Sequence, residues 1–187
     1  GTVNVLKAAL NGGASKVIHT STSEVYGTAK FTPISEDHPL QGQSPYSASK
    51  IGADMIAESF ARSFNLPVVT LRPFNTYGPR QSERAVISTA IRQILDDQCE
   101  VIKLGDLSPA RDFNFVGDTV AAFLAAAQLS ENEFGQAFNA GSGNMVTIAE
   151  TVDLIRAITK SDKPIIQENV RMRPIDSEVM ALMADAS

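Results

Sequence analysis

Apolar residues recur along this chain at two spacings, one typical of helices and the other of buried strands. Short runs rich in β-branched residues predict strands at 16–20, 68–72, 100–104 and 136–139, with one more short strand after Pro164. Helical spacing predicts helices at 1–10, 45–64, 84–97, 117–129 and 148–159. Strands that alternate with helices in this way predict an α/β fold with a mainly parallel sheet.

Two helices in the second half carry further signals. Thr147 and Glu150 have the spacing of a capping box, which predicts a helix that begins at Ile148. The inner face of this helix is expected to consist of Ile148, Val152, Ile155 and Ile158. The apolar run 120–129 is too short to span a bilayer and predicts a buried helix.

Composition narrows the class of protein. The chain has 187 residues, 43% of them apolar, and a formal net charge of −5 with the two signs well mixed. This predicts one globular domain, or one domain with a small appendage, and argues against a nucleic-acid partner, which requires a basic surface. One cysteine and two histidines argue against a disulfide framework and against a metal site. No signal peptide or membrane span is evident, so we expect a cytoplasmic protein without a membrane partner.

Both ends of the sequence interrupt a pattern. The helical spacing begins at Gly1 itself, and the residues after Ala181 stop without a terminating motif. We therefore expect the chain to be a fragment cut at both ends.

Unusual polar residues follow two of the predicted strands. Ser21-Thr-Ser-Glu24 comes after the strand at 16–20, and Asn75 follows the strand at 68–72. In open α/β sheets, ligands bind in the crevice outside the carboxyl ends of the strands. Hydroxyl residues are also ordinary at turns, so each loop alone is weak evidence. The two loops together favour a binding site at this edge of the sheet.

A tyrosine and a lysine share one face of the helix predicted at 45–64. Tyr46 and Lys50 lie four positions apart, next to Pro45, which suits the first helical position. An ammonium beside a phenol favours the phenolate, which makes the tyrosine usable as a general base. A surface tyrosine beside a solvated lysine is the alternative, and this spacing alone does not separate the two.

Five motifs, taken together, resemble one family. In chain order they are Ser21-Thr-Ser-Glu-Val-Tyr-Gly27, Tyr46-Ser-Ala-Ser-Lys50, Leu71-Arg-Pro-Phe-Asn-Thr-Tyr-Gly-Pro-Arg80, Ala110-Arg-Asp-Phe113 and Phe138-Asn-Ala-Gly141. The chain is similar to the extended short-chain dehydrogenase/reductases that act on nucleotide sugars, the NAD-dependent epimerase/dehydratase family. The resemblance covers nearly the whole chain.

The resemblance implies a Rossmann-like doubly wound parallel sheet with a small α/β substrate-binding lobe. Residues 1–80 would be the later half of the NAD(P)-binding domain, with the catalytic residues, and residues 81–187 would alternate between Rossmann elements and the lobe. The glycine-rich turn that binds the cofactor's pyrophosphate belongs to the first βαβ unit, which the resemblance puts before Gly1. Bound NAD or NADP, a nucleotide-sugar substrate and a homodimer paired through helices are also implied.

The resemblance further implies roles for single residues. Tyr46 would take the proton from a sugar hydroxyl, Lys50 would hold the cofactor's ribose, and Thr22 would bind the reacting sugar oxygen. Thr22-Ser-Glu24 looks like the triad of GDP-mannose-type 4,6-dehydratases, with Glu24 as the base at C5 and Ser23 helping at the C6 oxygen. The other implied cofactor contacts are Thr20, Ser21 and Pro73. The implied substrate contacts are Asn75, Arg80, Arg111 and Arg173.

The reaction stays open at this point. UDP-glucuronate decarboxylases share the Thr-Ser-Glu triad, nucleotide-sugar 4-epimerases share the family's oxidation step, and a non-catalytic binding module would keep the fold alone. The wider context in Ile18 to Gly27, Ile34 to Leu40 and Arg171 to Glu178 looks most like the nucleotide-activated N-acetylglucosamine 4,6-dehydratases of the legionaminic-acid pathway. The expected substrate is therefore a UDP-, GDP- or CDP-N-acetylhexosamine.

Several other features receive structural interpretations. Gly141-Ser-Gly143 lacks the third glycine of a dinucleotide fingerprint and predicts a plain loop. His19 is expected to be a satisfied core histidine, and His38 to lie in a polar loop without an identifiable partner. Val86 and Leu104 either line the nucleotide pocket or pack the core.

Overall fold

A three-stranded parallel sheet forms the centre of the larger half of the protein. The computed structural model describes residues 1–168, 170 and 179–185. Strands β1 (Val17–Thr20), β2 (Val68–Pro73) and β7 (Ala137–Ala140) lie in the order β1-β2-β7, with Val17 opposite Val68 and Thr70 opposite Ala137. The prediction of an α/β fold with a parallel sheet is confirmed.

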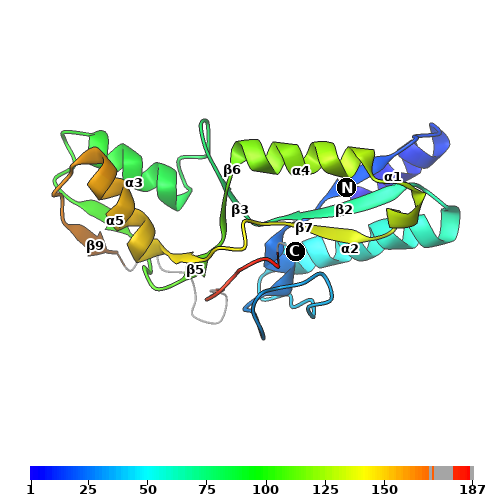
Figure 1. The fold of residues 1–187 in the computed structure, drawn as a ribbon, viewed down its shortest axis with the longest axis horizontal. Helices are drawn as coiled ribbons and strands as arrows, with labels where there is room; N and C mark the ends of the chain where they lie inside the picture. Colours follow the sequence, from blue (N-terminus) through cyan, green and yellow to red (C-terminus); the bar gives the residue numbers. More distant parts are fainter. Residues whose placement is uncertain (169, 171–178, 186–187) are drawn as a thin grey trace.

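Helices cover both faces of this sheet. Helix α2 (Pro45–Phe64), with α1 (Thr2–Asn11) packed beside it, lies on one face, and α4 (Val116–Gln128) lies on the other (Figure 1). Helix α2 begins where the sequence predicts, because Pro45 follows Ser44, whose hydroxyl accepts from the Ser47 amide over 3.1 Å. The buried core between helices α1 and α2 and the sheet consists of Leu6, Ala57, Phe60, Leu66 and Val68.

A smaller lobe lies at the other end of the molecule (Figure 1). It contains α3 (Val86–Leu95), α5 (Ile148–Thr159) and the parallel pair β4 (Ile102–Leu104) and β9 (Ile165–Gln167). The capping box at Thr147 and Glu150 is confirmed, with the Glu150 amide donating to Thr147 Oγ1 over 3.1 Å. The buried core of the lobe consists of Ala90, Ile94, Ile102, Leu104, Ile148 and Val152.

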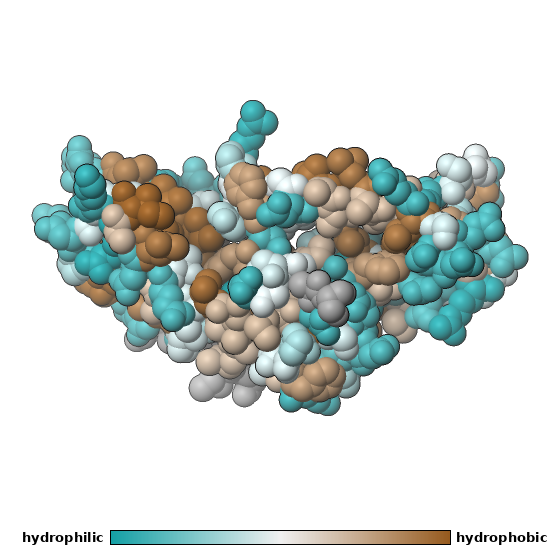
Figure 2. All heavy atoms as spheres, in the orientation of Figure 1, coloured by the Kyte–Doolittle hydropathy of each residue, from teal (hydrophilic) through white to brown (hydrophobic). Residues whose placement is uncertain are grey.

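Two predictions about helix faces are wrong. Ile158 is 72% exposed, because at about 100° per residue it lies off the face of α5 that Ile148, Val152 and Ile155 present to the core of the lobe. Helix α4 was expected to be buried, yet Val120 and Leu124 are 52% and 62% exposed, and Ala126 is its one buried residue. One face of α4 rests on β1 and β2, and its outer apolar face forms part of the brown surface in Figure 2. No helix in the described ranges is both long and apolar enough to cross a membrane.

Short elements that the sequence pattern did not predict join the sheet to the lobe. Strands β3 (Asn75–Tyr77) and β6 (Phe113–Phe115) pair in parallel, and β5 (Ala110–Arg111) pairs antiparallel with β8 (Val146–Thr147). Two short 3-10 helices, η1 (Ser23–Tyr26) and η2 (Glu131–Glu133), complete the described elements. Strands of two or three residues are too short to show a hydrophobic period, so they give no signal in the sequence.

The C-terminal segment (residues 179–185) runs between the loop after β1 and strand β5. The Ala110 amide donates to the Met180 carbonyl over 2.9 Å, and the Ile34 amide donates to the Met183 carbonyl over 2.8 Å. A third buried cluster joins this segment to η1 and to the end of β2, and it consists of Val25, Tyr26, Ile34, Phe74, Val179, Leu182 and Ala184.

Asp112 fastens the C-terminal segment to the loop after β7. Its fully buried carboxylate accepts from the amides of Ser142, Gly143 and Ala184 over 2.8, 2.9 and 3.1 Å, and from the Ser142 hydroxyl over 2.6 Å. Asp112→Ala would leave these buried donors without an acceptor, so the free energy of unfolding should fall by about 3 kcal/mol. Urea unfolding checks this, with the exposed Asp153→Ala as the matched control, and an equal loss in both variants would contradict it.

Candidate active site

The predicted catalytic triad lies directly after β1. Thr22 has extended backbone angles and begins η1, with its Oγ1 accepting from the Glu24 amide over 3.3 Å. Ser23 is buried and Glu24 is half-buried. The three side chains therefore follow the carboxyl end of the edge strand β1, where open α/β sheets bind ligands.

Helix α2 brings the predicted tyrosine and lysine to the same edge. Lys50 Nζ donates to the carbonyl of Thr20, the last residue of β1, over 2.6 Å. This bond ties the ammonium to the strand end that precedes Thr22. Tyr46 lies one turn earlier on α2 and is 52% exposed, so its phenol is accessible from solvent.

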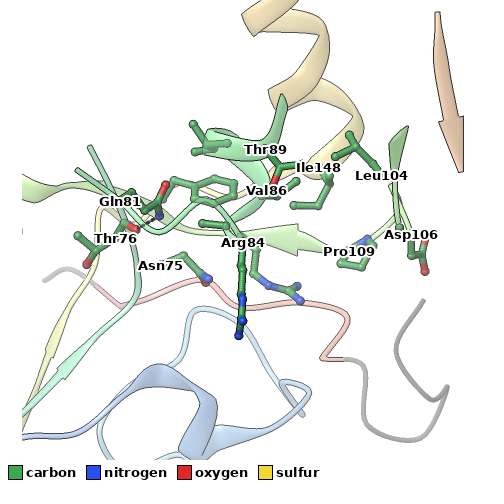
Figure 3. A pocket seen from close by; sticks show the side chains of 15 residues that line it. Asn75, Thr76, Gln81, Arg84, Val86, Thr89, Leu104, Asp106, Pro109 and Ile148 are labelled. Carbon is green, nitrogen blue, oxygen red and sulfur yellow. Dashed lines mark hydrogen bonds between the residues drawn. The ribbon is translucent and has the colours of Figure 1, made fainter. Parts of the chain in front are cut away.

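A cavity of about 320 Å³ lies between the lobe and the short strands β3, β5 and β6 that join it to the sheet, a size suited to a small-molecule ligand. Its lining includes two predicted substrate contacts, Asn75 and Arg111, and two residues for which packing was the alternative, Val86 and Leu104. The last two line the cavity and also pack in the core of the lobe. Figure 3 shows Asn75 and Arg84 on one side of the cavity, across from the apolar side chains of Val86 and Ile148.

Asn75 carries the clearest sign that the cavity receives a ligand. Its Oδ1 is buried without a hydrogen-bond partner, although buried amide oxygens are nearly always satisfied. Arg111 is 8% exposed, and one of its guanidinium nitrogens donates to the Ala110 carbonyl over 3.0 Å. The cavity thus joins an unsatisfied acceptor to a buried cation, which suits a ligand with both hydroxyl groups and anionic oxygens.

None of Thr22, Ser23 and Glu24 lines the cavity, and neither Tyr46 nor Lys50 does. Phe74, the neighbour of Asn75 in the chain, and Val25, the neighbour of Glu24, belong to one buried cluster, so packed side chains connect the cavity wall with η1.

Not every predicted site residue lies with these groups. Arg80 is exposed and does not line the cavity. Pro73 ends β2, opposite Ala140. The hydroxyl of Ser21 donates to Asp54 over 2.8 Å and its amide donates to Leu71, so neither donor of Ser21 is available to a cofactor. Arg173 lies outside the described residues.

Sequence reasoning missed several polar residues of the cavity, among them Gln81, Arg84 and Asp106. Gln81 and Arg84 come from the loop before α3, and Asp106 comes from the turn after β4. The polar run after Gly78 was the available signal, but a solvated loop has the same composition.

Asp54 is the centre of a buried polar group below the triad. It is 2% exposed and bonds His19 and Ser21 over 3.0 and 2.8 Å, with Arg72 at 3.2 Å. Burial raises the pKa of Asp54, but the bonds from His19 and Ser21 and the charge of Arg72 outweigh it, so that the pKa lies below its ordinary value. The prediction that His19 is a satisfied histidine is confirmed.

Folding stability should therefore depend on the charge of Asp54. A pKa below the ordinary 3.8 in the folded chain means that the carboxylate stabilises the fold at pH values above 3.8, and that this contribution is lost as the pH falls through the folded value. The difference in free energy of unfolding between the wild type and Asp54→Asn should shrink from pH 7 to about pH 3. A constant difference in urea titrations across this range, or the same shrinkage in the exposed Asp97→Asn, would contradict it.

Two further side chains near the triad, those of His38 and Tyr26, are also held by hydrogen bonds. His38, for which no partner was identifiable in the sequence, is 2% exposed, accepts from the Lys30 amide over 3.0 Å and bonds the Pro39 carbonyl over 2.9 Å. Both partners come from the fold of its own loop, which the sequence pattern does not show. Burial raises the pKa of Tyr26, whose hydroxyl accepts from Arg72 and donates to Asn139.

The described residues fit the nicotinamide end of a dinucleotide better than its pyrophosphate. The Lys50 ammonium, a hydrogen-bond donor, lies at the carboxyl end of β1, where it bonds the carbonyl of Thr20. The amides of Ser142 and Gly143, in the glycine-containing loop after β7, already donate to Asp112, which agrees with a plain loop. No group of three or more potential ligands in the described ranges is arranged to hold a metal ion.

A parallel sheet with hydroxyl and carboxyl residues after one strand and a tyrosine–lysine pair on the next helix defines a Rossmann-fold short-chain dehydrogenase/reductase. The chain belongs more narrowly to the GDP-mannose 4,6 dehydratase family, whose sequence profile matches residues 1–187.

Individual relatives agree with this family and differ in reaction. The chain is 36% identical to a UDP-glucose 4-epimerase of Mycolicibacterium smegmatis, with 88% of this chain and 53% of that protein covered. It is 34% identical to a dTDP-glucose 4,6-dehydratase of Actinoplanes, with 83% and 48% covered. The structure of TunA, an NAD-dependent NDP-hexosamine 5,6-dehydratase of tunicamycin biosynthesis, superposes with a TM-score of 0.87 at 29% identity, with 100% and 59% covered. The chain therefore spans about half the length of the curated relatives it matches.

Proposed function

We propose that this chain is the catalytic and substrate-binding part of an NAD(P)-dependent nucleotide-sugar 4,6-dehydratase. The observation that carries the proposal is Glu24 on η1, two residues after Thr22 and close in the chain to the strand end that Lys50 binds. An epimerase that removes and returns one hydride needs no further base, whereas elimination of water across C5 and C6 needs one. Residues 1–80 would supply this chemistry, and the lobe formed within residues 81–187 would bind the nucleotide.

Each polar residue of the edge then has a role. The phenolate of Tyr46, stabilised by the Lys50 ammonium, takes the proton from the C4 hydroxyl and becomes a neutral phenol, and Lys50 also binds the ribose. Thr22, whose oxygen already accepts from the Glu24 amide, keeps its own proton to donate to the sugar oxygen at C4. Glu24 removes the C5 proton, and Ser23 assists proton delivery to the departing C6 hydroxyl.

Bound NAD or NADP supplies the acceptor and donor of hydride that oxidation at C4 and reduction at C6 require. The part of the cofactor that these residues would hold is the nicotinamide and its ribose, with Tyr46 and Lys50 on one side and Thr20 and Pro73 along the strand ends. Ser21, whose two donors are already engaged, would contribute packing there.

The cavity suits the nucleotide half of the substrate, a UDP-, GDP- or CDP-N-acetylhexosamine. Arg111 would pair with the diphosphate, because a guanidinium matches two phosphate oxygens. Asn75 would use its unsatisfied oxygen for a hydroxyl of the sugar or ribose. Arg80 and Arg173 remain proposed contacts. A cytoplasmic homodimer paired through α1 and α2 is also proposed, and Val5 and Met55, which are 63% and 46% exposed on these helices, support it.

Product analysis of the complete protein that contains this chain tests the reaction. The protein, loaded with NAD, is incubated separately with the GDP-, UDP- and CDP-linked N-acetylglucosamines and with UDP-glucuronate, and the products are analysed by mass spectrometry and by NMR, which distinguishes epimers. A dehydratase gives a product lighter by one water with the nucleotide intact. Loss of carbon dioxide from UDP-glucuronate would indicate a decarboxylase. An epimer of unchanged mass would indicate an epimerase, and a failure to convert any of the supplied nucleotide sugars would indicate a binding module. Each of these three results would overturn the proposal.

A further inference from the structure

A buried arginine with two different hydrogen-bond partners joins the two elements that carry the proposed catalytic residues. Arg72, on β2, is 5% exposed. Its Nε donates to Asp54 Oδ2 on α2 over 3.2 Å, and its Nη1 donates to the Tyr26 hydroxyl on η1 over 2.9 Å. The guanidinium also lies over the Tyr26 ring, 5.2 Å from its centroid. One rigid planar group therefore links the long helix to the short one.

The two ends of this link lie close to the proposed chemistry along the chain. Asp54 follows Lys50 by four residues and so lies on the same side of α2. Tyr26 ends the 3-10 helix that contains Glu24. The link is further braced by Ser21, which donates to Asp54, and by Asn139, which accepts from the Tyr26 hydroxyl over 2.7 Å.

Stability alone is a weak explanation for this arrangement. Burying an ion pair costs desolvation that the attraction between the charges often fails to offset, and apolar side chains of similar volume frequently serve as well. A guanidinium that donates from two of its nitrogens to two different partners, in contrast, fixes distance and direction to both, which packed apolar side chains do less strictly.

We propose that Asp54 and Arg72 are positioning residues that set α2 relative to η1, and thereby hold Tyr46 and Lys50 in register with Thr22 and Glu24. The roles of these four residues are those of the proposed function, on which this inference rests. Asp54 and Arg72 themselves bind neither substrate nor cofactor. They act through the two helices, and Tyr26 transmits the constraint to η1.

Backbone amide exchange tests the link without reference to any reaction. In Asp54→Asn and in Tyr26→Phe, the amides of Val25 and Gly27 on and after η1 should exchange about tenfold faster, while the amides of α5 keep their rates. Glu58→Gln is the matched control, because Glu58 lies one turn beyond Asp54 on α2 and pairs with Arg62 at the surface. Unchanged exchange at η1 in both variants, or equal acceleration throughout the fold, would overturn the proposal.

The kinetic test uses the rate at which added nucleotide sugar reduces the cofactor bound to the complete protein. Misalignment of this kind should lower the rate by about 10²-fold in Asp54→Asn, while KM stays within about threefold. Asp54→Asn and Tyr26→Phe should be strongly non-additive in combination, because both act through Arg72. Full additivity, or a rise in KM with an unchanged rate, would contradict the proposal.

Two features of the design keep the outcomes separate. C4 oxidation is shared by dehydratases, epimerases and decarboxylases, so the rate measurement stays readable if the wild type fails to eliminate water, which would sink the proposed function alone. Tyr26→Phe removes one hydroxyl and no charge, so it carries the test if Asp54→Asn does not fold.

Discussion

Replacing Tyr46 by phenylalanine is expected to lower the rate of sugar oxidation by about 10²- to 10⁴-fold, the range typical of a lost general base. The ring is retained, so the exposed position on α2 should tolerate the change with little effect on folding. The rate is measured as reduction of the bound cofactor after nucleotide sugar is added. KM should change little, because the phenol acts mainly in the transition state.

A second tyrosine provides the control for this prediction. Tyr77, on β3, packs edge-on against Phe113 and Phe115 with ring centroids 6.4 and 5.8 Å away, and it does not line the cavity. Tyr77→Phe removes the same hydroxyl and should keep the rate within about threefold of the wild type. If Tyr46→Phe behaves like Tyr77→Phe, Tyr46 is not the base.

Glu24→Gln is expected to separate the two halves of the reaction. The amide has the same shape but cannot take the C5 proton, so formation of the dehydrated product should fall at least about 100-fold. Oxidation at C4 depends on Tyr46, Lys50 and Thr22, and it should continue. The measurement combines cofactor reduction with mass analysis of the sugar, and a 4-keto sugar that has kept its C6 hydroxyl should accumulate.

The control replaces a glutamate remote from the site. Glu100 is exposed just before β4, and Glu100→Gln should leave both steps unchanged. Elimination that persists in Glu24→Gln would mean that another group is the C5 base. Loss of oxidation together with elimination would mean that Glu24 supports the structure of the site instead of acting at C5.

The longer elements of this fold were predictable because their patterns are local. Helix α2 has a start signal at Ser44 and Pro45, and β2 is a run rich in β-branched residues that ends at a proline. Faces were harder to predict. The apolar pattern of α4 and α5 does not show how much of each apolar side a neighbouring element covers, so Val120, Leu124 and Ile158 were expected to be buried and are exposed.

The residues of the candidate site also fall into those that the sequence predicts and those that it does not. Thr22, Glu24, Tyr46 and Lys50 stand in short motifs that can be read in the sequence. The cavity combines loops that lie far apart in the chain, so the contribution of Asp106 could not be predicted from its neighbours. The link from Asp54 through Arg72 to Tyr26 joins residues 18 and 46 positions apart, and no local pattern specifies such a contact.

Transfer of a label from C4 to C6 tests the central claim most directly. The complete protein, loaded with unlabelled NAD, receives the nucleotide-linked N-acetylhexosamine that it converts, carrying deuterium at C4, and the product is examined by NMR. A 4,6-dehydratase moves the hydride within one sugar, so the deuterium should appear in the C6 methyl group. Deuterium that remains at C4, in the substrate or in its epimer, would contradict the assignment of this chain to a dehydratase.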